Sequence, residues 1–240
     1  MTLTGKTVLV TGANRGIGRA LVEEALSRGA ERVYAGTRQA LNPRDERVTP
    51  LALDLTDAAQ INLAAETVDS LDVLINNAGV YGYEDLADRA ALEQHLAVNL
   101  FGPYAVTQAF LPRLVESQGA IVNVLSLAAV AAVPISPAYS ISKAAAFSFT
   151  QSLRATLAGR SVNVHAVLSG PVDTDMVRDL EIPKASPQSV AAAILDGLHK
   201  GEDEIFPDPF SQALADSWNS GAVKALERQN AALVAAAQNQ

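Results

Sequence analysis

The 240-residue sequence contains no cysteine. This absence excludes disulfide bonds, a thiol nucleophile and cysteine-ligated metal, and it fits a reducing compartment. Basic residues are also few: 18 Lys and Arg stand against 26 Asp and Glu, giving a formal net charge of −8. Such a charge argues against a nucleic-acid or anionic-membrane partner. The three histidines, His95, His165 and His199, share no ligand spacing, so we expect no bound metal.

Long apolar segments are missing as well. The longest mostly apolar run, residues 125–135, contains Ser126 and Pro134 and is far too short to span a bilayer. The chain passes from Met1 almost directly into a strand-like segment, without the charged and apolar regions of a signal peptide. Hydrophobic residues make up 49% of the chain and charged residues 18%, which is ordinary for a globular protein. We therefore expect a soluble, cytoplasmic, single-domain protein over residues 1–240.

Short segments rich in β-branched residues alternate with longer helical segments along the chain. The predicted strands lie at residues 7–10, 32–36, 48–53, 73–75, 120–125 and 162–167, with an edge strand at 204–206. The predicted helices lie at residues 17–28, 57–68, 86–114, 138–158, 187–199 and 211–236. Nearly continuous apolar strands are typical of sheets that are covered on both faces. The alternation therefore predicts an α/β fold, with a central parallel β-sheet in a Rossmann-like, doubly wound arrangement flanked by helices.

Three regions depart from this regular alternation. Only nine residues, 39–47, join the second and third strands, which predicts a shortened crossover without a proper helix. Residues 175–187 are short and polar, and we expect them to form a small lid. Residues 207–240 are expected to form a C-terminal helical tail. The acidic clusters at 173–175 and 202–204 are interpreted as solvated loops rather than a metal site.

A glycine-rich segment connects the first predicted strand to the first predicted helix. Its glycines are Gly12, Gly16 and Gly18. Glycine allows a tight turn and lets the backbone approach a pyrophosphate, which then lies at the positive end of the helix. A glycine-rich turn that serves only packing is the alternative. The segment therefore predicts a nucleotide-binding loop, and this prediction needs support from other motifs.

Tyr139 and Lys143 are four residues apart in a predicted helix, so their side chains share one face. Ser126 follows a predicted strand thirteen residues earlier. Carbonyl reduction requires a proton donor at the oxygen while hydride reaches the carbon. An ammonium about 4 Å from a phenol contributes roughly 4 kcal/mol at an effective dielectric of about 20. We therefore expect Lys143 to lower the pKa of Tyr139 toward neutrality, so that Tyr139 acts as acid and base.

These motifs occur together in one order. The glycine spacing, the Asn-Asn-Ala-Gly segment at 76–79, Asn99, Ser126 and the Tyr139–Lys143 pair resemble the short-chain dehydrogenase/reductase family. The resemblance extends from about Thr4 to Thr174. It implies a catalytic set of four residues, Asn99, Ser126, Tyr139 and Lys143. It further implies that Lys143 holds the nicotinamide ribose hydroxyls and that Asn99 positions a water linking Lys143 to solvent.

The loop after the sixth predicted strand extends the resemblance. Ser169-Gly-Pro-Val-Asp-Thr174 is similar to the family's Pro-Gly-x-Val-x-Thr loop, which holds the nicotinamide carboxamide and a phosphate oxygen, although serine replaces the first proline. The residues expected to bind the cofactor are Gly12, Asn14, Arg15, Gly16, Ile17, Gly18, Arg38, Asp54, Leu55, Asn77, Ala78, Gly79, Tyr139, Lys143, Gly170, Val172 and Thr174.

The end of the second predicted strand indicates which cofactor binds. NAD-binding Rossmann units carry an acid about 20 residues past the glycine loop, where it contacts the ribose 2′-hydroxyl. Here that position is Arg38, and residues 35–38 contain no acid. Arg15 can reach the same 2′-phosphate from the glycine loop. Asp54 comes later and, by resemblance, contacts the adenine side. We therefore predict NADP(H) as the cofactor.

The leading functional hypothesis is an NADP(H)-dependent reductase of small aldehydes or ketones, or the reverse alcohol oxidation. The carbonyl substrate is expected to be apolar, because five residues before Tyr139 are expected to line the pocket: Val130, Ala132, Val133, Pro134 and Ile135. One alternative is a non-catalytic regulatory protein that binds NADPH. Another is a nucleotide-sugar epimerase or dehydratase, although residues 175–240 leave little room for a substrate domain. The resemblance also implies a homodimer or homotetramer.

Overall fold

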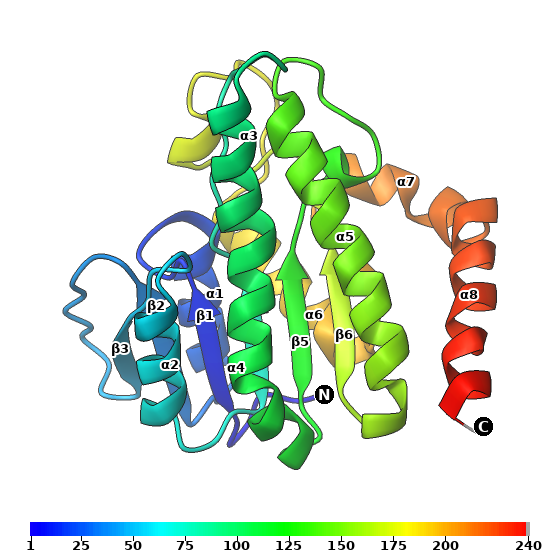
Figure 1. The fold of residues 1–240 in the computed structure, drawn as a ribbon. Helices are drawn as coiled ribbons and strands as arrows, with labels where there is room; N and C mark the ends of the chain where they lie inside the picture. The colour runs from blue at the N-terminus through cyan, green and yellow to red at the C-terminus, as the bar shows by residue number, and fades with distance from the viewer. Residues whose placement is uncertain (239–240) are drawn as a thin grey trace.

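The computed structural model describes the backbone of residues 1–238 and the side chains of residues 1–232. Its strands are β1 (Thr7–Thr11), β2 (Arg32–Thr37), β3 (Val48–Ala52), β4 (Val73–Asn76), β5 (Ala120–Val124), β6 (Asn163–Val167) and β7 (Glu204–Ile205). In residues 1–238 they form one seven-stranded sheet in the order β3-β2-β1-β4-β5-β6-β7 (Figure 1). Every neighbouring pair is parallel. The chain adds β2 and β3 on one side of β1 and then β4 to β7 on the other side, so the strand order reverses between β1 and β4. This reversal confirms the predicted doubly wound, Rossmann-like domain.

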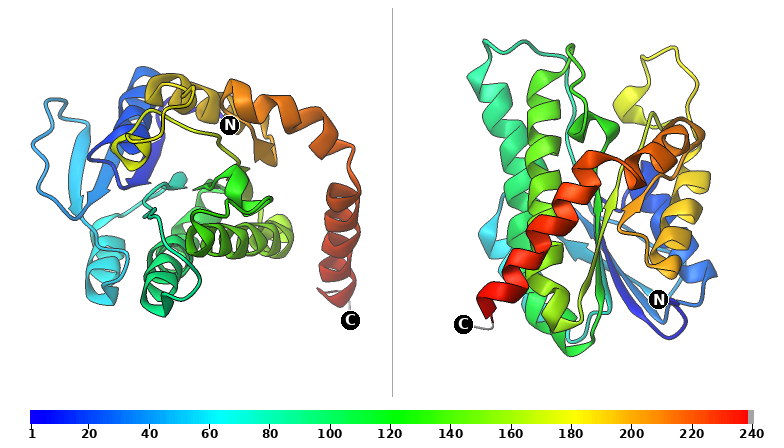
Figure 2. Two further views of the ribbon diagram at one scale, coloured as in Figure 1. Left: turned by 90° about the horizontal axis from the view of Figure 1, so that it is seen from above. Right: turned by 90° about the vertical axis from the view of Figure 1, so that its right-hand side faces the viewer.

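Helices cover both faces of the sheet, as Figures 1 and 2 show. One face carries α1 (Gly16–Ser27) and α6 (Pro187–Lys200). The other face carries α2 (Ala58–Thr67), α4 (Gly102–Glu116) and α5 (Pro137–Leu157). Because both faces are covered, the central strands β4 and β5 are buried along their whole length.

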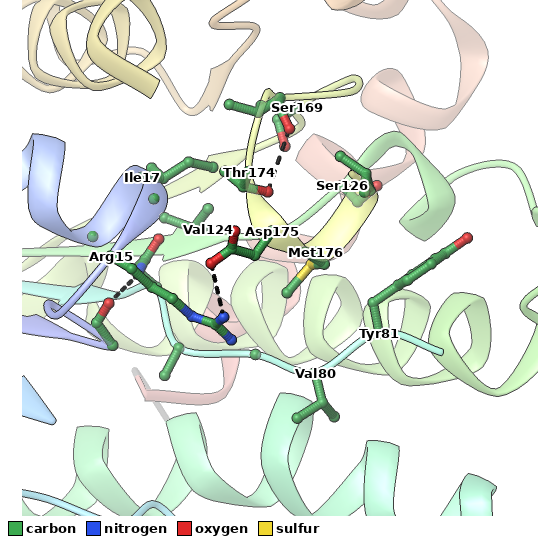
Figure 3. Close-up of a pocket in the computed structure, with 18 of the residues that line it drawn as sticks. Arg15, Ile17, Val80, Tyr81, Val124, Ser126, Ser169, Thr174, Asp175 and Met176 are labelled. Atoms are coloured by element: carbon green, nitrogen blue, oxygen red, sulfur yellow. Dashed lines mark hydrogen bonds and ion pairs between the residues drawn. The ribbon is translucent and has the colours of Figure 1, made fainter. Parts of the chain in front are cut away.

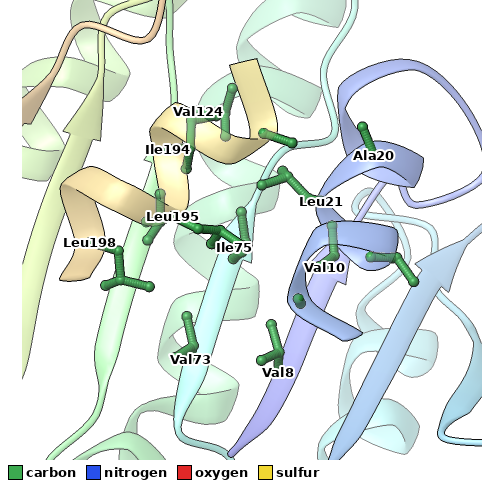
Figure 4. Close-up of a cluster of buried hydrophobic side chains, with 14 of the residues drawn as sticks. Val8, Val10, Ala20, Leu21, Val73, Ile75, Val124, Ile194, Leu195 and Leu198 are labelled. Atoms are coloured by element: carbon green, nitrogen blue, oxygen red, sulfur yellow. The ribbon is translucent and has the colours of Figure 1, made fainter. Parts of the chain in front are cut away.

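Each helical layer buries its own apolar cluster against the sheet. On the α1 and α6 side, Leu21 and Ile194 pack with Val8 and Ile75 (Figure 4). On the opposite side, Phe110 of α4 belongs to a second cluster with residues of β1, β4 and β5. Full burial of one such side chain is worth about 1.5–3 kcal/mol, so these two clusters hold the loops at the strand ends in fixed positions.

The connections reproduce the predicted shortened crossover. Residues 39–47, between β2 and β3, contain no helix. The segment 175–187 contains a single 3-10 turn, Asp175–Val177, and its Ala185 pairs with Val172 before α6 begins. This segment therefore lies over the loop that follows β6.

The helix predicted over residues 86–114 is interrupted. It consists of α3 (Arg89–Leu96), a π-helix over Ala97–Phe101, and α4. Asn99 lies within the π-helix, and its side chain bonds both backbone groups of Val80: Oδ1 accepts from the N–H at 2.8 Å and Nδ2 donates to the carbonyl at 3.0 Å. The wider π-turn accommodates this contact, and such turns are frequent at functional sites.

The C-terminal segment also differs from its prediction. The helix expected over 211–236 is two helices, α7 (Pro209–Asn219) and α8 (Ala222–Gln238), and α8 lies beside α5 (Figure 2). The prediction that residues 202–204 form a solvated loop is wrong for Glu204, which is buried. Glu204 pairs at 2.8 Å with both Arg154 of α5 and Lys224 of α8. A buried carboxylate needs such partners, and these two connect α8 to the sheet edge.

Candidate active site

A cavity of about 850 Å³ runs along the carboxyl ends of the strands. Its walls come from the loops after β1 to β6 and from the segment 175–182. Open α/β sheets bind ligands at this edge, where the strand order reverses. Every residue predicted to bind the cofactor lines this one cavity, although they are spread from residue 12 to residue 174. Figure 3 shows several of them around the cavity.

The glycine loop forms a cradle at the start of α1. Gly12 and Gly16 have positive φ values of 68° and 53°, which favour glycine. A Cβ added at Gly18 would overlap the carbonyl oxygen of Gly12, so the loop requires glycine there too. Asn77, from the loop after β4, donates its side-chain amide to the Thr11 carbonyl at 2.9 Å. Strands β1 and β4 are thereby joined directly below the loop.

The N-terminus of α1 is suited to an anion. The N-cap residue Arg15 makes no side-chain capping bond within the described structure, and the first turn contains no acidic residue. The first N–H groups of a helix need acceptors, and the helix dipole favours a negative charge there. The glycine cradle and this uncapped helix end therefore fit the pyrophosphate of a nicotinamide dinucleotide.

Tyr139 and Lys143 lie in the first two turns of α5 and line the same cavity. Lys143 is buried, and its Nζ donates to the carbonyl of Val124 at 3.0 Å. Burial lowers the pKa of the Lys143 ammonium to about 8. The same effect acts on the phenol in the other direction, because burial raises the pKa of Tyr139 to about 12.

The expected lowering of the Tyr139 pKa by Lys143 is therefore wrong for the protein without cofactor. The ammonium points to Val124 and lies 5.7 Å from the centre of the Tyr139 ring. Burial of the phenol is the largest influence on its pKa; the Ser126 hydroxyl lowers that pKa by less, and Tyr81 raises it further. Tyr81 packs edge-on against Tyr139, with 5.0 Å between ring centres. Sequence spacing placed the two groups on one helix face but did not give the direction of the ammonium.

Ser126 and Asn99 approach the helix α5 from different sides. Ser126 follows β5, lines the cavity and accepts from the Ala128 N–H at 3.1 Å. Asn99 does not line this cavity; it is buried behind α5, where its Nδ2 donates to Ser142 Oγ at 2.9 Å. Asn99 and Lys143 share a second, small cavity of about 10 Å³, which Asn76 and Asn123 also line. That volume suits about one water, which fits the water that the family resemblance implied.

Arg15 and Arg38 both line the cavity but differ in their partners. Arg15 donates to Asp175 Oδ2 at 3.1 Å (Figure 3). Asp175 also pairs with Arg178. Both hydrogen bonds lower the pKa of Asp175, and the bond from Arg178 has the larger effect. Arg38 is exposed and forms no ion pair in the described part of the chain. Arg38 alone is therefore free to meet a further anion.

Asp54 lies near Arg38 in the loop after β3. Its Oδ1 accepts from the N–H of Thr56 at 2.9 Å and from the Thr56 hydroxyl at 2.7 Å. These bonds, followed by the charge of Arg38, lower the pKa of Asp54. Its carboxylate is therefore ionised and held toward the cavity at neutral pH.

The predicted apolar wall is largely wrong. Of the five residues proposed before α5, only Val133 lines the cavity. The other four, Val130, Ala132, Pro134 and Ile135, are exposed. The turn Leu127–Ala129 and the bend before α5 direct them outward.

Other apolar side chains line the cavity instead: Tyr81, Leu127, Met176, Leu180, Ile182 and Phe210. The sequence held a signal for Met176, Leu180 and Ile182, because they are apolar residues in the otherwise polar segment 175–187 that was expected to form a lid. No sequence pattern pointed to Phe210, which comes from α7. Within the described residues, no group of three or more His, Cys, Asp or Glu could hold a metal ion.

Comparisons with known proteins agree with this geometry. The family model described as short chain dehydrogenase matches residues 6–184. The short chain dehydrogenase pigC of Monascus ruber is 36% identical over 197 residues, which cover 73% of this chain and 65% of that protein, just under two thirds of its length. The 3-oxoacyl-(acyl-carrier-protein) reductase FabG of Aquifex aeolicus is 34% identical over 223 residues, or 80% of this chain and 90% of that protein.

A solved structure gives a closer likeness over the whole chain. It is a short chain dehydrogenase from Burkholderia cenocepacia in complex with NADP, with a TM-score of 0.87 and 38% sequence identity. The match covers 95% of this chain and 98% of that chain. No helix among residues 1–238 has both the length and the apolar character that crossing a membrane would require.

Proposed function

Because this chain belongs to the short-chain dehydrogenase/reductase family of NAD(P)-dependent oxidoreductases, we propose that it transfers hydride between NADPH and the carbonyl of a small, apolar aldehyde or ketone. The reverse alcohol oxidation uses the same groups. One observation carries the proposal: Ser126, Tyr139 and Lys143 line the same cavity as the glycine cradle. Ser126 follows the end of β5, whereas Tyr139 and Lys143 belong to α5.

We assign the proton transfer to Tyr139. The bound nicotinamide supplies the hydride, and Tyr139 donates its phenolic proton to the carbonyl oxygen. Burial raises the pKa of this phenol to about 12 in the protein without cofactor, so the proton needed for carbonyl reduction is present at neutral pH. Ser126 holds the same oxygen through its hydroxyl, and Lys143 binds ribose hydroxyls. Asn99 fixes α5 through Ser142 and lines the small second cavity together with Lys143.

We propose NADPH rather than NADH as the preferred cofactor. Arg38 supports this preference, because it is an exposed cation at the end of β2, where NAD-binding units carry an acid. The similar protein from Burkholderia cenocepacia holds NADP, which also supports it. Arg15 is the second candidate for the 2′-phosphate, but its ion pair with Asp175 must first be broken.

We propose an apolar substrate because the walls beside the catalytic residues are apolar. Leu127, Val133, Met176 and Ile182 all line the cavity. In this arrangement residues 175–187 act as a lid and residues 207–240 as a helical tail. Homodimers or homotetramers are proposed because two aromatic residues close together in the chain are exposed, Phe101 at the end of the π-helix and Tyr104 in α4. A cytoplasmic location fits the absence of cysteine.

The decisive experiment measures NADPH consumption by the purified protein against a panel of aldehydes, ketones, quinones and imines, with NADH in parallel. We expect turnover with at least one apolar aldehyde or ketone and a lower kcat/KM with NADH. Tight binding of NADPH without turnover of any compound in either direction would contradict the reductase proposal. It would favour the alternative, a non-catalytic NADPH-binding regulator.

A further inference from the structure

Phe210 is an exposed aromatic side chain inside the cavity. It is the second residue of α7, and 66% of its surface is exposed to solvent. It nevertheless lines the same cavity as Ser126 and Tyr139. A large apolar surface in a concave site gains free energy when an apolar ligand covers it and releases water. The position of this ring relative to the catalytic residues therefore bears on the substrate.

Asp208 fixes the start of α7, which carries Phe210. It is the N-cap residue of α7 and only 2% exposed. Its Oδ1 accepts from the Ser211 N–H at 3.0 Å, and its Oδ2 accepts from the Ser211 hydroxyl at 2.8 Å. Oδ2 also accepts from the Gly170 N–H at 2.8 Å, across 38 residues of sequence. Because charge-assisted bonds of this kind are strong, α7 begins at a fixed position on the loop after β6.

The same loop leads directly to the catalytic residues. The carbonyl of Ser169 accepts from the N–H of Leu127 at 2.9 Å, and Leu127 follows Ser126. On its other side, a Cβ added at Gly170 would lie 3.2 Å from the Cβ of Phe210, so the Phe210 side chain packs on the Gly170 backbone. Two successive contacts therefore join Phe210 to Ser126. They place the ring near Ser126 in the cavity.

We propose that Phe210 is a specificity-determining residue that packs against the part of the substrate beyond the carbonyl and favours an aryl or similarly sized apolar group. Met176 and Ile182, which are 42% and 45% exposed, offer further apolar surface to the same group. Asp208 is the positioning residue that holds the ring there through Gly170. The inference rests on the proposed reductase function and adds that the C-terminal segment recognises the apolar group beyond the carbonyl. Aromatic pairs gain energy beyond their buried area, which favours an aryl group over a branched alkyl group.

The experiment compares two methyl ketones, acetophenone and acetone, which differ by the ring. The ratio of their kcat/KM values is measured with NADPH for the parent, Phe210→Ala, Phe210→Leu and Leu214→Ala. Leu214 is a matched control, because it is an exposed apolar residue of α7 outside the cavity wall. We expect the parent to prefer acetophenone and Phe210→Ala to lower the ratio by about tenfold or more, since hydrophobic pocket contacts discriminate by about 10–200-fold. Phe210→Leu should be intermediate, and Leu214→Ala should keep the parent ratio.

Asp208→Asn tests the positioning role. In the parent background, it should lower the ratio of kcat/KM for acetophenone to that for acetone. In the Phe210→Ala background it should leave this ratio unchanged, because Asp208 acts on acetophenone only through Phe210. Calorimetric binding of acetophenone to the NADP complex is measured in parallel. Ring-dependent binding without turnover would overturn the reductase function and leave the role of Phe210 standing. The inference is overturned if the kcat/KM ratio of Phe210→Ala lies within about twofold of the parent ratio. It is also overturned if the parent and Phe210→Ala bind acetophenone equally tightly.

Discussion

Lys143 Nζ donates a 3.0 Å hydrogen bond to the carbonyl oxygen of Val124, the last residue of β5. Helix α5 and the central strand β5 are thereby joined through an ammonium that has almost no contact with water. A buried cation with a neutral acceptor keeps only part of its hydration energy, which explains why burial lowers the pKa of Lys143 to about 8. The cofactor-free protein therefore carries a destabilising charge at its catalytic centre.

Lys143→Met should stabilise the cofactor-free protein at neutral pH. Below the folded-state pKa of about 8, the ammonium is charged in both states and folding must bury it. Between about pH 8 and the ordinary value of 10.5, the folded state loses this proton first, so the stability of the parent rises with pH. The advantage of Lys143→Met should therefore shrink across that window. Urea unfolding of both proteins from about pH 7 to about pH 10 measures the difference.

Lys200→Met is the matched control, because Lys200 is exposed at the end of α6. It should show no change in relative stability across the same window. A constant stability difference between the parent and Lys143→Met at every pH would contradict the lowered pKa.

Tyr139→Phe should lower kcat by about 10²–10⁴-fold, the usual contribution of a positioned acid or base. The ring remains to pack against Tyr81, so the dissociation constant of NADPH should stay within several-fold of the parent. Stopped-flow measurement of hydride transfer separates these two effects. Tyr83→Phe, which removes a hydroxyl from an exposed ring outside the cavity wall, should keep the parent rate. Retention of more than about a tenth of the parent rate would remove Tyr139 from the acid–base role.

Arg38→Asp should weaken NADPH binding by about tenfold or more, since hydrogen bonds to charged groups contribute about 1.5–3 kcal/mol. NADH binding should be unchanged or stronger, because the new carboxylate can accept from a 2′-hydroxyl. Arg44→Asp, an equal change of charge in the exposed β2–β3 connection, should have a much smaller effect. Fluorescence titration of both cofactors at physiological salt provides the measurement. Equal NADH and NADPH affinity in the parent would disprove the cofactor assignment.

Asp175→Asn should strengthen NADPH binding by about two- to fivefold, because it releases Arg15 for the 2′-phosphate, and exposed ion pairs are weak. NADH binding should not change, since NADH lacks that phosphate. Asp179→Asn removes an exposed carboxylate four residues further along the same segment and serves as the control. The same titration detects the change. If Asp175→Asn strengthens both cofactors equally, the ion pair does not compete with the 2′-phosphate.

The sequence by itself determined the sheet and the parts of the site that depend on local geometry. Apolar β-branched segments predicted β1 to β6, because a strand buried on both faces must be apolar throughout. Gly12 and Gly16 marked a backbone that needs positive φ, and four-residue spacing placed Tyr139 and Lys143 on one helix face. Parallel strands then bring such loop residues to one edge of the sheet, as the cavity-lining residues between 12 and 174 illustrate.

Only the tertiary structure decided where long-range partners direct each group. The π-helix at Asn99 depends on the backbone of Val80, and the place of Phe210 depends on the bond between Asp208 and Gly170. The direction of the Lys143 ammonium depends on Val124. Spacing along one chain segment cannot encode these contacts, because each needs a partner that the fold brings from elsewhere. The pKa values of the catalytic groups follow from burial, which exists only once the layers have packed.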